Sequence, residues 1–203
     1  YNNDGFLDLL VSQGEQLYWA TNDVTGNFTE PIPISLELIP LALTDLNNDG
    51  NIDIIGQLFV PPFSLVWLVG DGTGNFGTVN TIDNASYYYL SKMLPADLDN
   101  DGDTDLVVSD IETIGFFENL GEGVLGLKQV IAAQIPNLEA IRLADLDGDG
   151  DLDIVSVSSG DDVVAWYENI SNNPNISGLV YYDVDQNGIY DGDDFGLNFQ
   201  NIT

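Results

Sequence analysis

Hydrophobic and polar residues alternate along most of this chain, in short runs that polar turns separate. Segments 6–12 (FLDLLVS), 104–110 (TDLVVSD) and 152–159 (LDIVSVSS) are rich in β-branched residues and follow the two-residue period of half-buried strands. No segment keeps a helical period over about 12 residues. The pattern therefore predicts an all-β protein.

An aspartate-rich segment occurs four times along the chain. The copies are residues 1–10 (YNNDGFLDLL), 45–55 (DLNNDGNIDII), 97–108 (DLDNDGDTDLVV) and 145–155 (DLDGDGDLDIV). Their central glycines are 45, 52 and 48 residues apart, at Gly5, Gly50, Gly102 and Gly150. An aromatic residue follows each glycine by 14 to 17 residues, and these are Trp19, Trp67, Phe116 and Trp166. The chain therefore repeats one structural unit.

Each copy predicts a strand, the Asp loop, a second strand, a hairpin, an aromatic strand, a Gly turn and a last strand. Four strands in about 45–50 residues are the size of a propeller blade. We expect a partial β-propeller of about four four-stranded blades, at approximately residues 1–38, 39–88, 89–137 and 138–170. The first blade lacks its first strand and the last its outermost strand, so we expect the remaining blades from the rest of a longer parent chain.

A different pattern follows the fourth copy. Residues 171–177 (SNNPNIS) form a polar linker. Residues 178–203 hold one apolar strand and then an acidic loop, whose Gly188 lies 38 residues after Gly150 and so breaks the blade spacing. We expect the start of another domain here.

Composition excludes many kinds of chemistry. The chain has no Cys and no His, which rules out disulfides, thiol chemistry, a Ser-His-Asp triad and Cys- or His-ligated zinc. The chain contains 3 Lys and Arg and 34 Asp and Glu, which gives a net charge of −31. We therefore expect neither nucleic acid nor anionic membranes as partners. The apolar stretch 54–70 contains Pro61 and Pro62 and predicts two buried strands, with no membrane insertion. Carboxylate and carbonyl chemistry remains, which suits hard cations.

The fourth Asp loop spaces its oxygen ligands as a calcium loop does. With Asp145 as position 1, carboxylates occupy positions 1, 3, 5 and 9, and glycine at position 6 allows the sharp turn. Calcium takes 6–8 oxygen ligands in flexible geometry, whereas magnesium demands a tighter octahedron and keeps more water. The predicted calcium ligands are Asp145, Asp147, Asp149, the Asp151 carbonyl and Asp153.

The other loops follow the same positions. The second loop offers Asp45, Asn47, Asp49, the Asn51 carbonyl and Asp53, and the third offers Asp97, Asp99, Asp101, the Asp103 carbonyl and Asp105. The first loop lacks position 1, so we expect a weak site from Asn2, Asp4, the Phe6 carbonyl and Asp8. The loop after the linker extends to position 12, with Asp183, Asp185, Asn187, the Ile189 carbonyl, Asp191 and Asp194.

An alternative interpretation is that these loops are solvated turns with no ion. Asp next to Gly is common in turns, because its side chain hydrogen-bonds the backbone two residues on. However, several carboxylates a few ångströms apart repel one another unless a cation lies among them. Three complete copies at blade spacing therefore favour calcium.

Two other repeated features have alternative interpretations. The aromatic residue of each copy either packs between neighbouring sheets or stacks on a sugar, and an aromatic in every blade favours packing. Glu118 and Glu168 occupy equivalent positions, which favours a repeat feature over a catalytic carboxylate pair.

The four segments resemble FG-GAP/VCBS repeats, the calcium-loop propeller repeats that integrin alpha subunits also contain. DLNNDGNIDI, DLDNDGDTDL, DLDGDGDLDI, WATNDVTGNF and WLVGDGTGNF carry the resemblance, whereas the Gly-Asn-Phe turn is replaced by GEGVLG in the third copy and is missing from the fourth. The segment from Gly178 (GLVYYDVDQNGIYDGDDFGL) resembles the opening of an SdrD B-like domain, an Ig-like calcium-binding stalk module. The resemblance thus implies a truncated Ig-like β segment at 178–203.

These resemblances imply a secreted or cell-surface bacterial protein in which calcium is structural and lies away from the ligand side. We expect a non-enzymatic, calcium-stabilised extracellular module that acts in adhesion or as a recognition scaffold for an extracellular protein or glycan. One alternative is an accessory carbohydrate-binding part of a secreted polysaccharide-degrading enzyme. Another is a catalytic propeller with paired carboxylates, although no such pair outside the Asp loops stands out.

Overall fold

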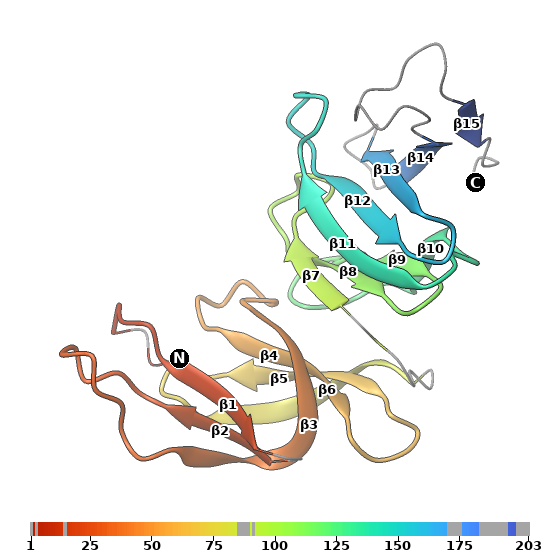
Figure 1. Ribbon diagram of the computed structural model, residues 1–203. Coiled ribbons are helices and arrows are strands. Elements are labelled where there is room, and N and C mark those ends of the chain that lie inside the picture. The colour runs from red at the N-terminus through yellow and green to blue at the C-terminus, as the bar shows by residue number, and fades with distance from the viewer. Residues whose placement is uncertain are drawn as a thin grey trace. The chain divides into compact units, whose positions relative to one another are not determined.

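The computed structural model describes residues 2, 4–13, 16–84, 90 and 92–169, together with the backbone of residues 176–182 and 195–197. These residues form strands, turns and loops, and none of them is helical. The chain divides into two compact units, residues 1–88 and 89–203, each described by itself below (Figure 1). The prediction of an all-β fold is confirmed.

The first unit contains one antiparallel sheet, in the order β1-β2-β3-β4-β5-β6. Its strands are β1 (Leu9–Gln13), β2 (Gln16–Ala20), β3 (Ile32–Thr44), β4 (Asp53–Leu58), β5 (Leu65–Gly70) and β6 (Phe76–Asp83). The apolar stretch 54–70 thus forms the two strands β4 and β5. The sequence prediction of two buried strands there is confirmed.

Strand β3 belongs to two repeats at once. Its first half pairs with β2, from Ile32 opposite Trp19 to Glu37 opposite Gln16. Its second half pairs with β4, from Leu38 opposite Leu58 onward. The register of the β2 pairing shifts within the first half, between Ile34 and Glu37. The outer strand of the first repeat thus continues directly as the first strand of the second.

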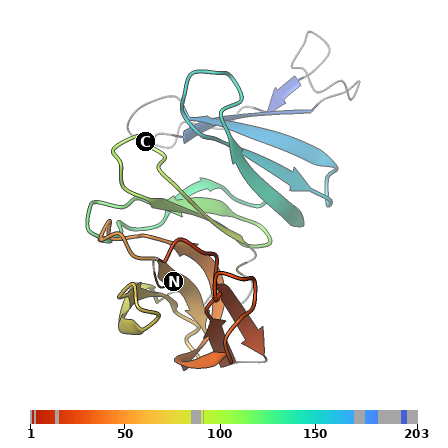
Figure 2. The ribbon, with the colours of Figure 1, turned by 90° about the vertical axis from the view of Figure 1, so that its left-hand side faces the viewer.

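The second unit contains two antiparallel sheets. One has the order β10-β9-β8-β7 and the other β11-β12-β13-β14-β15. The bounds are β7 (Lys92–Ala96), β8 (Asp105–Ser109), β9 (Ile114–Phe117), β10 (Gln129–Ala132), β11 (Leu138–Ala144), β12 (Asp153–Ser158), β13 (Val163–Asn169), β14 (Ile176–Tyr182) and β15 (Phe195–Leu197). In Figure 2 the green strands of the third repeat and the cyan strands of the fourth lie in two separate layers.

The strand after the Asp loop pairs with the aromatic strand in the same register in all four repeats. In each repeat the aromatic residue lies opposite the residue two places after the last Asp of the loop. These pairs are Leu10 with Trp19, Ile55 with Trp67, Val107 with Phe116 and Val155 with Trp166. The four copies are therefore the same structural unit, with the Asp loop entering the second strand and the aromatic residue on the third.

Apolar side chains from neighbouring repeats form the core of each unit. In the first unit, Leu17 and Trp19 of β2 pack with Ile54 of β4 and Leu68 of β5. In the second unit, side chains of β8 and β9 pack with side chains of β11, β12 and β13. Because an aromatic side chain buries a large apolar area, these contacts are the main force that holds one repeat on the next.

Trp19 covers the Gly turn of the following repeat. A Cβ at Gly74 would lie 2.1 Å from the Trp19 ring, so no side chain fits between them. Trp19 is only 8% exposed, and Phe116 in the third repeat is 2% exposed. For these two residues the packing interpretation of the repeated aromatic is confirmed.

Gly74→Ala should therefore destabilise the protein more than Gly26→Ala. Both glycines have a φ of +90° in the same Thr-Gly-Asn turn, but a Cβ at Gly26 meets nothing within 4 Å. We expect Gly26→Ala to cost about 1 kcal/mol of backbone strain and Gly74→Ala about 1–3 kcal/mol more, from the clash with Trp19. Urea unfolding of both variants measures the difference, and equal losses would contradict the Trp19 contact.

The fourth repeat differs from the expectation at its outer edge. The sequence analysis places no outermost strand there, but the backbone of β14 pairs with β13, with Glu168 opposite Ser177 and Trp166 opposite Leu179. Residues 176 and 177, which we expected in the linker, thus belong to a strand. An apolar segment that follows a short linker can fill an open sheet edge. The assignment of residues 178–203 to an SdrD B-like domain stays a prediction.

Within the part of the chain that the structure describes, no helix has the length and apolar character needed to cross a bilayer.

Candidate metal centre

The Asp loops fold tightly because two of their positions adopt left-handed backbone. Position 6 is glycine in each loop, with φ between +86° and +100° at Gly5, Gly50, Gly102 and Gly150. Position 4 is also left-handed, with φ of +56° at Asn48, +58° at Asn100 and +81° at Gly148. Asn and Gly are the residues that tolerate this conformation best. The sequence analysis identified position 6 and missed position 4.

Carboxylates fix the loop by accepting hydrogen bonds from its own backbone. At position 1, Asp97 accepts from the N–H groups of Asp101 (3.2 Å) and Gly102 (3.0 Å), and Asp45 accepts in the same way from Asp49 and Gly50. At position 5, Asp101 and Asp149 accept from the N–H two residues later, at 2.8 and 2.9 Å. These bonds hold the carboxylates of positions 1 and 5 against the backbone of their own loop.

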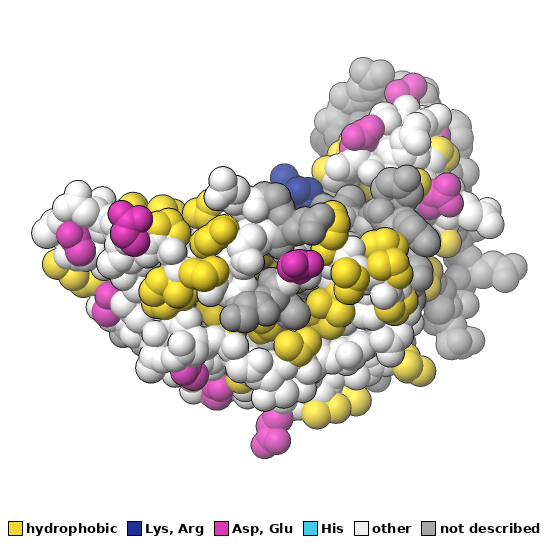
Figure 3. Space-filling model, turned by 90° about the horizontal axis from the view of Figure 1, so that it is seen from below, with side chains coloured by type: hydrophobic (Ala, Val, Ile, Leu, Met, Phe, Trp, Pro, Cys, Tyr) yellow, Lys and Arg dark blue, Asp and Glu magenta, His cyan; other side chains and the backbone are white. Residues whose placement is uncertain are grey.

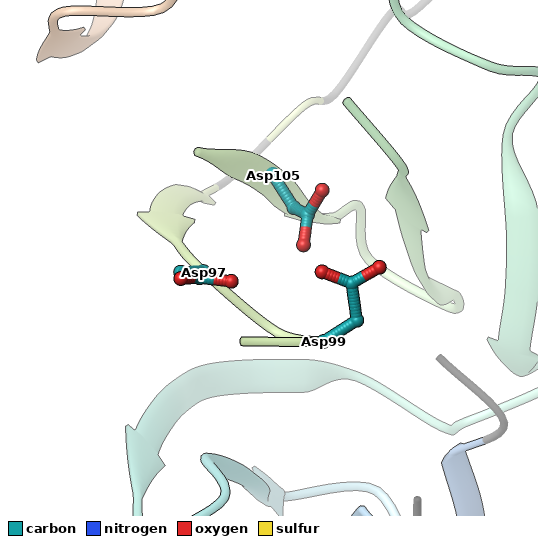
Figure 4. Close-up of side chains that lie close together, drawn as sticks. All are labelled: Asp97, Asp99 and Asp105. Carbon is teal, nitrogen blue, oxygen red and sulfur yellow. The ribbon is translucent and has the colours of Figure 1, made fainter. Parts of the chain in front are cut away.

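Among the loops that the structure describes, two bring three carboxylates together. In the third loop they belong to Asp97, Asp99 and Asp105, and Figure 4 shows them turned toward one common space. In the fourth loop they belong to Asp145, Asp147 and Asp149. Each set offers oxygen atoms that lie within 4.8 Å of one another, which is a spacing that a single cation can bridge.

The other predicted ligands lie outside these two carboxylate clusters. In the second loop, which the structure describes fully, Asp45, Asp49 and Asp53 do not form such a cluster of carboxylates, and position 3 is Asn47. In the first loop, Asn2 donates to Asp4 at 2.9 Å, and Asp4 accepts from the Phe6 N–H. The carbonyls of Phe6, Asn51, Asp103 and Asp151 stay predicted ligands. The fifth loop lies outside the described residues, with Asp183, Asp185, Asn187, Ile189, Asp191 and Asp194.

The Asp at position 9 also ties the loop to the sheet. Asp53, Asp105 and Asp153 are fully buried. Asp105 accepts from the Leu98 N–H at 2.9 Å and from the Asn119 N–H at 2.7 Å, and the other two Asp residues make the same pair of contacts. Position 9 is thus a structural bridge between the loop and the end of the aromatic strand, besides being a candidate ligand.

Sequence reasoning missed a repeated asparagine that completes this bridge. Asn119 donates from its side chain to the Thr104 carbonyl at 3.1 Å, and Asn169 donates to the Leu98 carbonyl at 2.7 Å. Both are buried. Asn169 is the last residue of β13, and Asn119 lies two residues after the end of β9. The signal was visible in the sequence, because FFEN and WYEN each end in Asn after the aromatic residue.

Two hydrogen bonds connect the third loop to the fourth repeat. Asn100, at position 4 of the third loop, donates to the Asp151 carboxylate of the fourth loop at 2.5 Å. Asn169 of β13 reaches back to the Leu98 carbonyl of the third loop at 2.7 Å. The Asp151 carboxylate therefore hydrogen-bonds the neighbouring loop, while the backbone carbonyl of Asp151 is the predicted calcium ligand.

Burial and nearby negative charges disfavour the ionised form of several carboxylates in and beside these loops. Burial, together with the charges of Asp99 and Asp101, raises the pKa of Asp105 to about 6, although two N–H groups act to lower it. Burial also raises the pKa of Asp53 and of Asp99. Burial and the charges of Asp147, Asp153 and Asp149 raise the pKa of Glu168, which places this glutamate near the fourth loop. Figure 3 shows carboxylates scattered over one face of the molecule and very little basic surface.

The Thr-Gly-Asn turns are stabilised without any ion. Asp71 accepts from the Thr73 N–H at 2.8 Å, the Thr73 hydroxyl at 2.7 Å and the Asn75 side chain at 3.1 Å. Asp23 makes the same contacts with Thr25 and Asn27 in the first repeat. These bonds, led by that of the Thr73 hydroxyl, lower the pKa of Asp71 to about 2.

The stabilisation from Asp71 should depend on pH. The folded pKa is about 2 and lies below the ordinary value of 3.8, so the charge stabilises the fold above about pH 4 and this contribution is lost as the pH falls through 2. We expect Asp71→Asn to lower the melting temperature at pH 7 in chelator, and the difference from wild type to shrink between pH 4 and pH 2. Glu30→Gln removes one exposed charge elsewhere and is the control. A difference that stays constant with pH would contradict the hydrogen-bonded carboxylate.

The architecture and the loops together define a protein of repeated four-stranded β-blades, each with one acidic loop. Family models agree, because the model described as FG-GAP-like repeat matches residues 1–56, 45–108 and 97–156. The chain belongs to the family of proteins with FG-GAP-like repeats, which confirms that part of the sequence resemblance. Each match begins near one Asp loop and ends just after the next, so consecutive matches overlap at an Asp loop.

One solved structure shows a similar fold. A lectin from Agrocybe aegerita, described for its specific recognition of non-reducing terminal N-acetylglucosamine, is 18% identical with a TM-score of 0.62. The match covers 87% of this chain and 48% of the lectin, so the chain spans about half of that protein. The Photorhabdus luminescens Tc holotoxin pore is 15% identical with a TM-score of 0.33, over 88% of this chain and 11% of the toxin chain. No curated protein matches the sequence.

Proposed function

We propose that this chain is a calcium-stabilised recognition module of a secreted or surface bacterial protein, and that it is not an enzyme. The observation that carries the proposal is the convergence of three carboxylates within 4.8 Å in each of two loops. The module acts in adhesion or as a recognition scaffold outside the cell, and calcium holds the blades that present its ligand surface.

The residues present fit calcium by the chemistry of their donors. The described loops offer carboxylate, carboxamide and carbonyl oxygens and no nitrogen or sulfur ligand, which is the donor set of a hard cation. Burial, together with the charges of Asp99 and Asp101, raises the pKa of Asp105, and a cation bound in this loop would offset that repulsion. The third loop would hold calcium with Asp97, Asp99 and Asp105, and the fourth with Asp145, Asp147 and Asp149.

Bound calcium supplies charge neutralisation and a cross-link between the ends of two strands. The chain's own part is to present the carboxylates from a loop that its backbone hydrogen bonds have already folded. The Asp at position 9 connects the calcium loop to the sheet, because Asp105 accepts hydrogen bonds from the backbone of both Leu98 and Asn119. Binding that occurs only in the folded state stabilises that state.

Asp149→Ala should lower stability only when calcium is present. Asp149 is an exposed member of the fourth cluster, and within the loop it accepts a hydrogen bond from the Asp151 N–H. We expect a loss of about 2–3 kcal/mol in calcium, the contribution of one site at ~100 times its dissociation constant, and little change in chelator. Calorimetric titration should show one calcium ion fewer than wild type. Equal losses with and without calcium would sink the proposal for this loop.

The second candidate function is carbohydrate binding as an accessory part of a polysaccharide-degrading enzyme. The structural similarity to a lectin with a TM-score of 0.62 supports it at the level of fold. The two functions are distinguished by the parent protein, because only the second requires a catalytic domain in the same chain. They share the expectation that the ligand is extracellular.

A further inference from the structure

The fourth repeat contains a small pocket at the end of its sheet remote from the Asp loop. The pocket has a volume of about 80 Å³ and lies between residues 132–136, which begin with the last residue of β10, and the strands β12 and β13. Strand β12 leaves the Asp loop at Asp153 and ends at Ser158, which lines the pocket. The pocket is therefore separate from the metal cluster and formed by two neighbouring repeats of the same unit.

Hydroxyl groups line the inner wall of this pocket. Ser156, Ser158 and Tyr167 are 2%, 4% and 4% exposed, and they lie on the same face of β12 and β13. Ser156 hydrogen-bonds the Tyr167 hydroxyl, and the Ser158 hydroxyl donates to the Asp161 carboxylate. Asp161 is thus held at the pocket by a buried partner, and a carboxylate with one such bond keeps further acceptor capacity.

The other repeats lack these hydroxyls, which makes the pocket a departure from the repeat rule. Their residues at the positions of Ser156 and Tyr167 are apolar or glycine: Gly56, Val108, Leu68 and Phe117. Apolar side chains would pack at these positions without the cost of burying polar groups. Places where a repeat breaks its own pattern at a cost in packing are expected to serve function.

The wall formed by residues 132–136 is fixed in place. The Ile135 N–H donates to the Glu112 carbonyl at 2.9 Å, and the Gly160 N–H donates to the Pro136 carbonyl at 3.0 Å. A Cβ at Gly160 would lie 2.5 Å from Pro136, so glycine is needed where the hairpin of β12 and β13 meets this wall. The pocket is therefore preformed and does not depend on a mobile segment.

The lining predicts the chemistry of the ligand. Hydroxyls that donate and accept, one carboxylate, and apolar carbons of Ala132, Pro136 and Ala165 match the alternating O–H and C–H groups of a sugar. No lining residue is basic, and the net charge of −31 repels anions, so the ligand is neutral. A volume of about 80 Å³ exceeds the roughly 10–15 Å³ that one water needs in the same measure, so it holds the edge of one ring or a short substituent.

We propose that this pocket binds the terminal residue of a neutral glycan through Ser156, Ser158, Asp161 and Tyr167. The assignment rests on the proposed function as a recognition module and names its ligand class and its contact surface. An internal residue of a long chain does not fit, since the pocket admits only one edge of a sugar. Calcium has a separate role, at the opposite end of the sheet.

Saturation-transfer NMR on the full chain in calcium tests the proposal. The probes are the methyl glycosides of glucose, galactose, mannose and N-acetylglucosamine, and we expect at least one to receive saturation from the protein. Tyr167→Phe removes one hydroxyl and keeps the ring, and Ala133→Phe blocks the exposed rim without removing a hydrogen bond. Each variant should weaken binding at least about tenfold. Val157→Ala, between the two serines but on the opposite face, should leave binding unchanged.

The outcomes separate this inference from the proposed function. If none of the four glycosides binds, the glycan assignment is overturned, while the calcium titration still decides the proposed function. If a glycoside binds and Ala133→Phe leaves its affinity unchanged, the pocket is wrong and recognition occurs elsewhere. If Tyr167→Phe does not fold, Ala133→Phe decides alone, because its site is exposed.

Discussion

Removal of calcium should lower the melting temperature of this protein by about 10–20 °C. Two clusters, at Asp97–Asp105 and Asp145–Asp149, have converging carboxylates. Each site contributes about 2.7 kcal/mol at ~100 times its dissociation constant, and 1 kcal/mol shifts the melting temperature of a domain of this size by about 2–4 °C. The measurement is a thermal melt by circular dichroism in excess calcium and in chelator.

Magnesium is the matched control for this experiment. It carries the same charge, but it demands octahedral geometry and releases its water reluctantly, so it should restore only a small part of the lost stability. Full recovery with magnesium would indicate general charge screening. Identical melting in calcium and in chelator would mean that the loops are solvated turns, and the proposed function would fail.

Asp105→Ala should destabilise the protein with or without calcium, by about 2–4 kcal/mol. Asp105 is fully buried, and its loss leaves the N–H groups of Leu98 and Asn119 without their acceptor. Each buried unpaired donor costs about 1–3 kcal/mol, and relief of a charge that burial disfavours offsets part of this. Urea unfolding in chelator measures the structural part by itself.

Asp101→Ala, in the same loop, is the comparison for Asp105→Ala. Asp101 is exposed and accepts from the Asp103 N–H on the loop surface, where water can replace it. Its loss in chelator should therefore be small. If both variants lose the same stability in chelator, the hydrogen bonds that Asp105 makes between loop and sheet do not stabilise the fold more than those of an exposed loop carboxylate.

The sequence was sufficient to predict the repeat, the strands and the loop positions, because each depends on local chemistry. The alternation in LDIVSVSS becomes β12, and the glycine at position 6 of each loop has the left-handed φ that the turn requires. The convergence of Asp145, Asp147 and Asp149 also follows from spacing within one loop. Features that are built within a dozen residues are therefore accessible to sequence reasoning.

Features that join distant residues were not accessible in the same way. The contact of Trp19 with Gly74 spans two repeats, and the bond from Asn169 to Leu98 spans 71 residues. The pocket requires a wall from one repeat and hydroxyls from the next, so the serines of VSVSS gave no signal by themselves. The pairing of β14 with β13 also depends on which edge is open in three dimensions.

Strand β3 has a consequence for how the first two repeats respond to proteases. Since one strand from Ile32 to Thr44 belongs to both repeats, no surface loop separates these repeats where a protease could cut. Limited digestion should release them together as a single fragment. Evolutionary exchange of one repeat for another would likewise need a junction elsewhere, and the Asp loops, where consecutive family matches overlap, are the natural junctions.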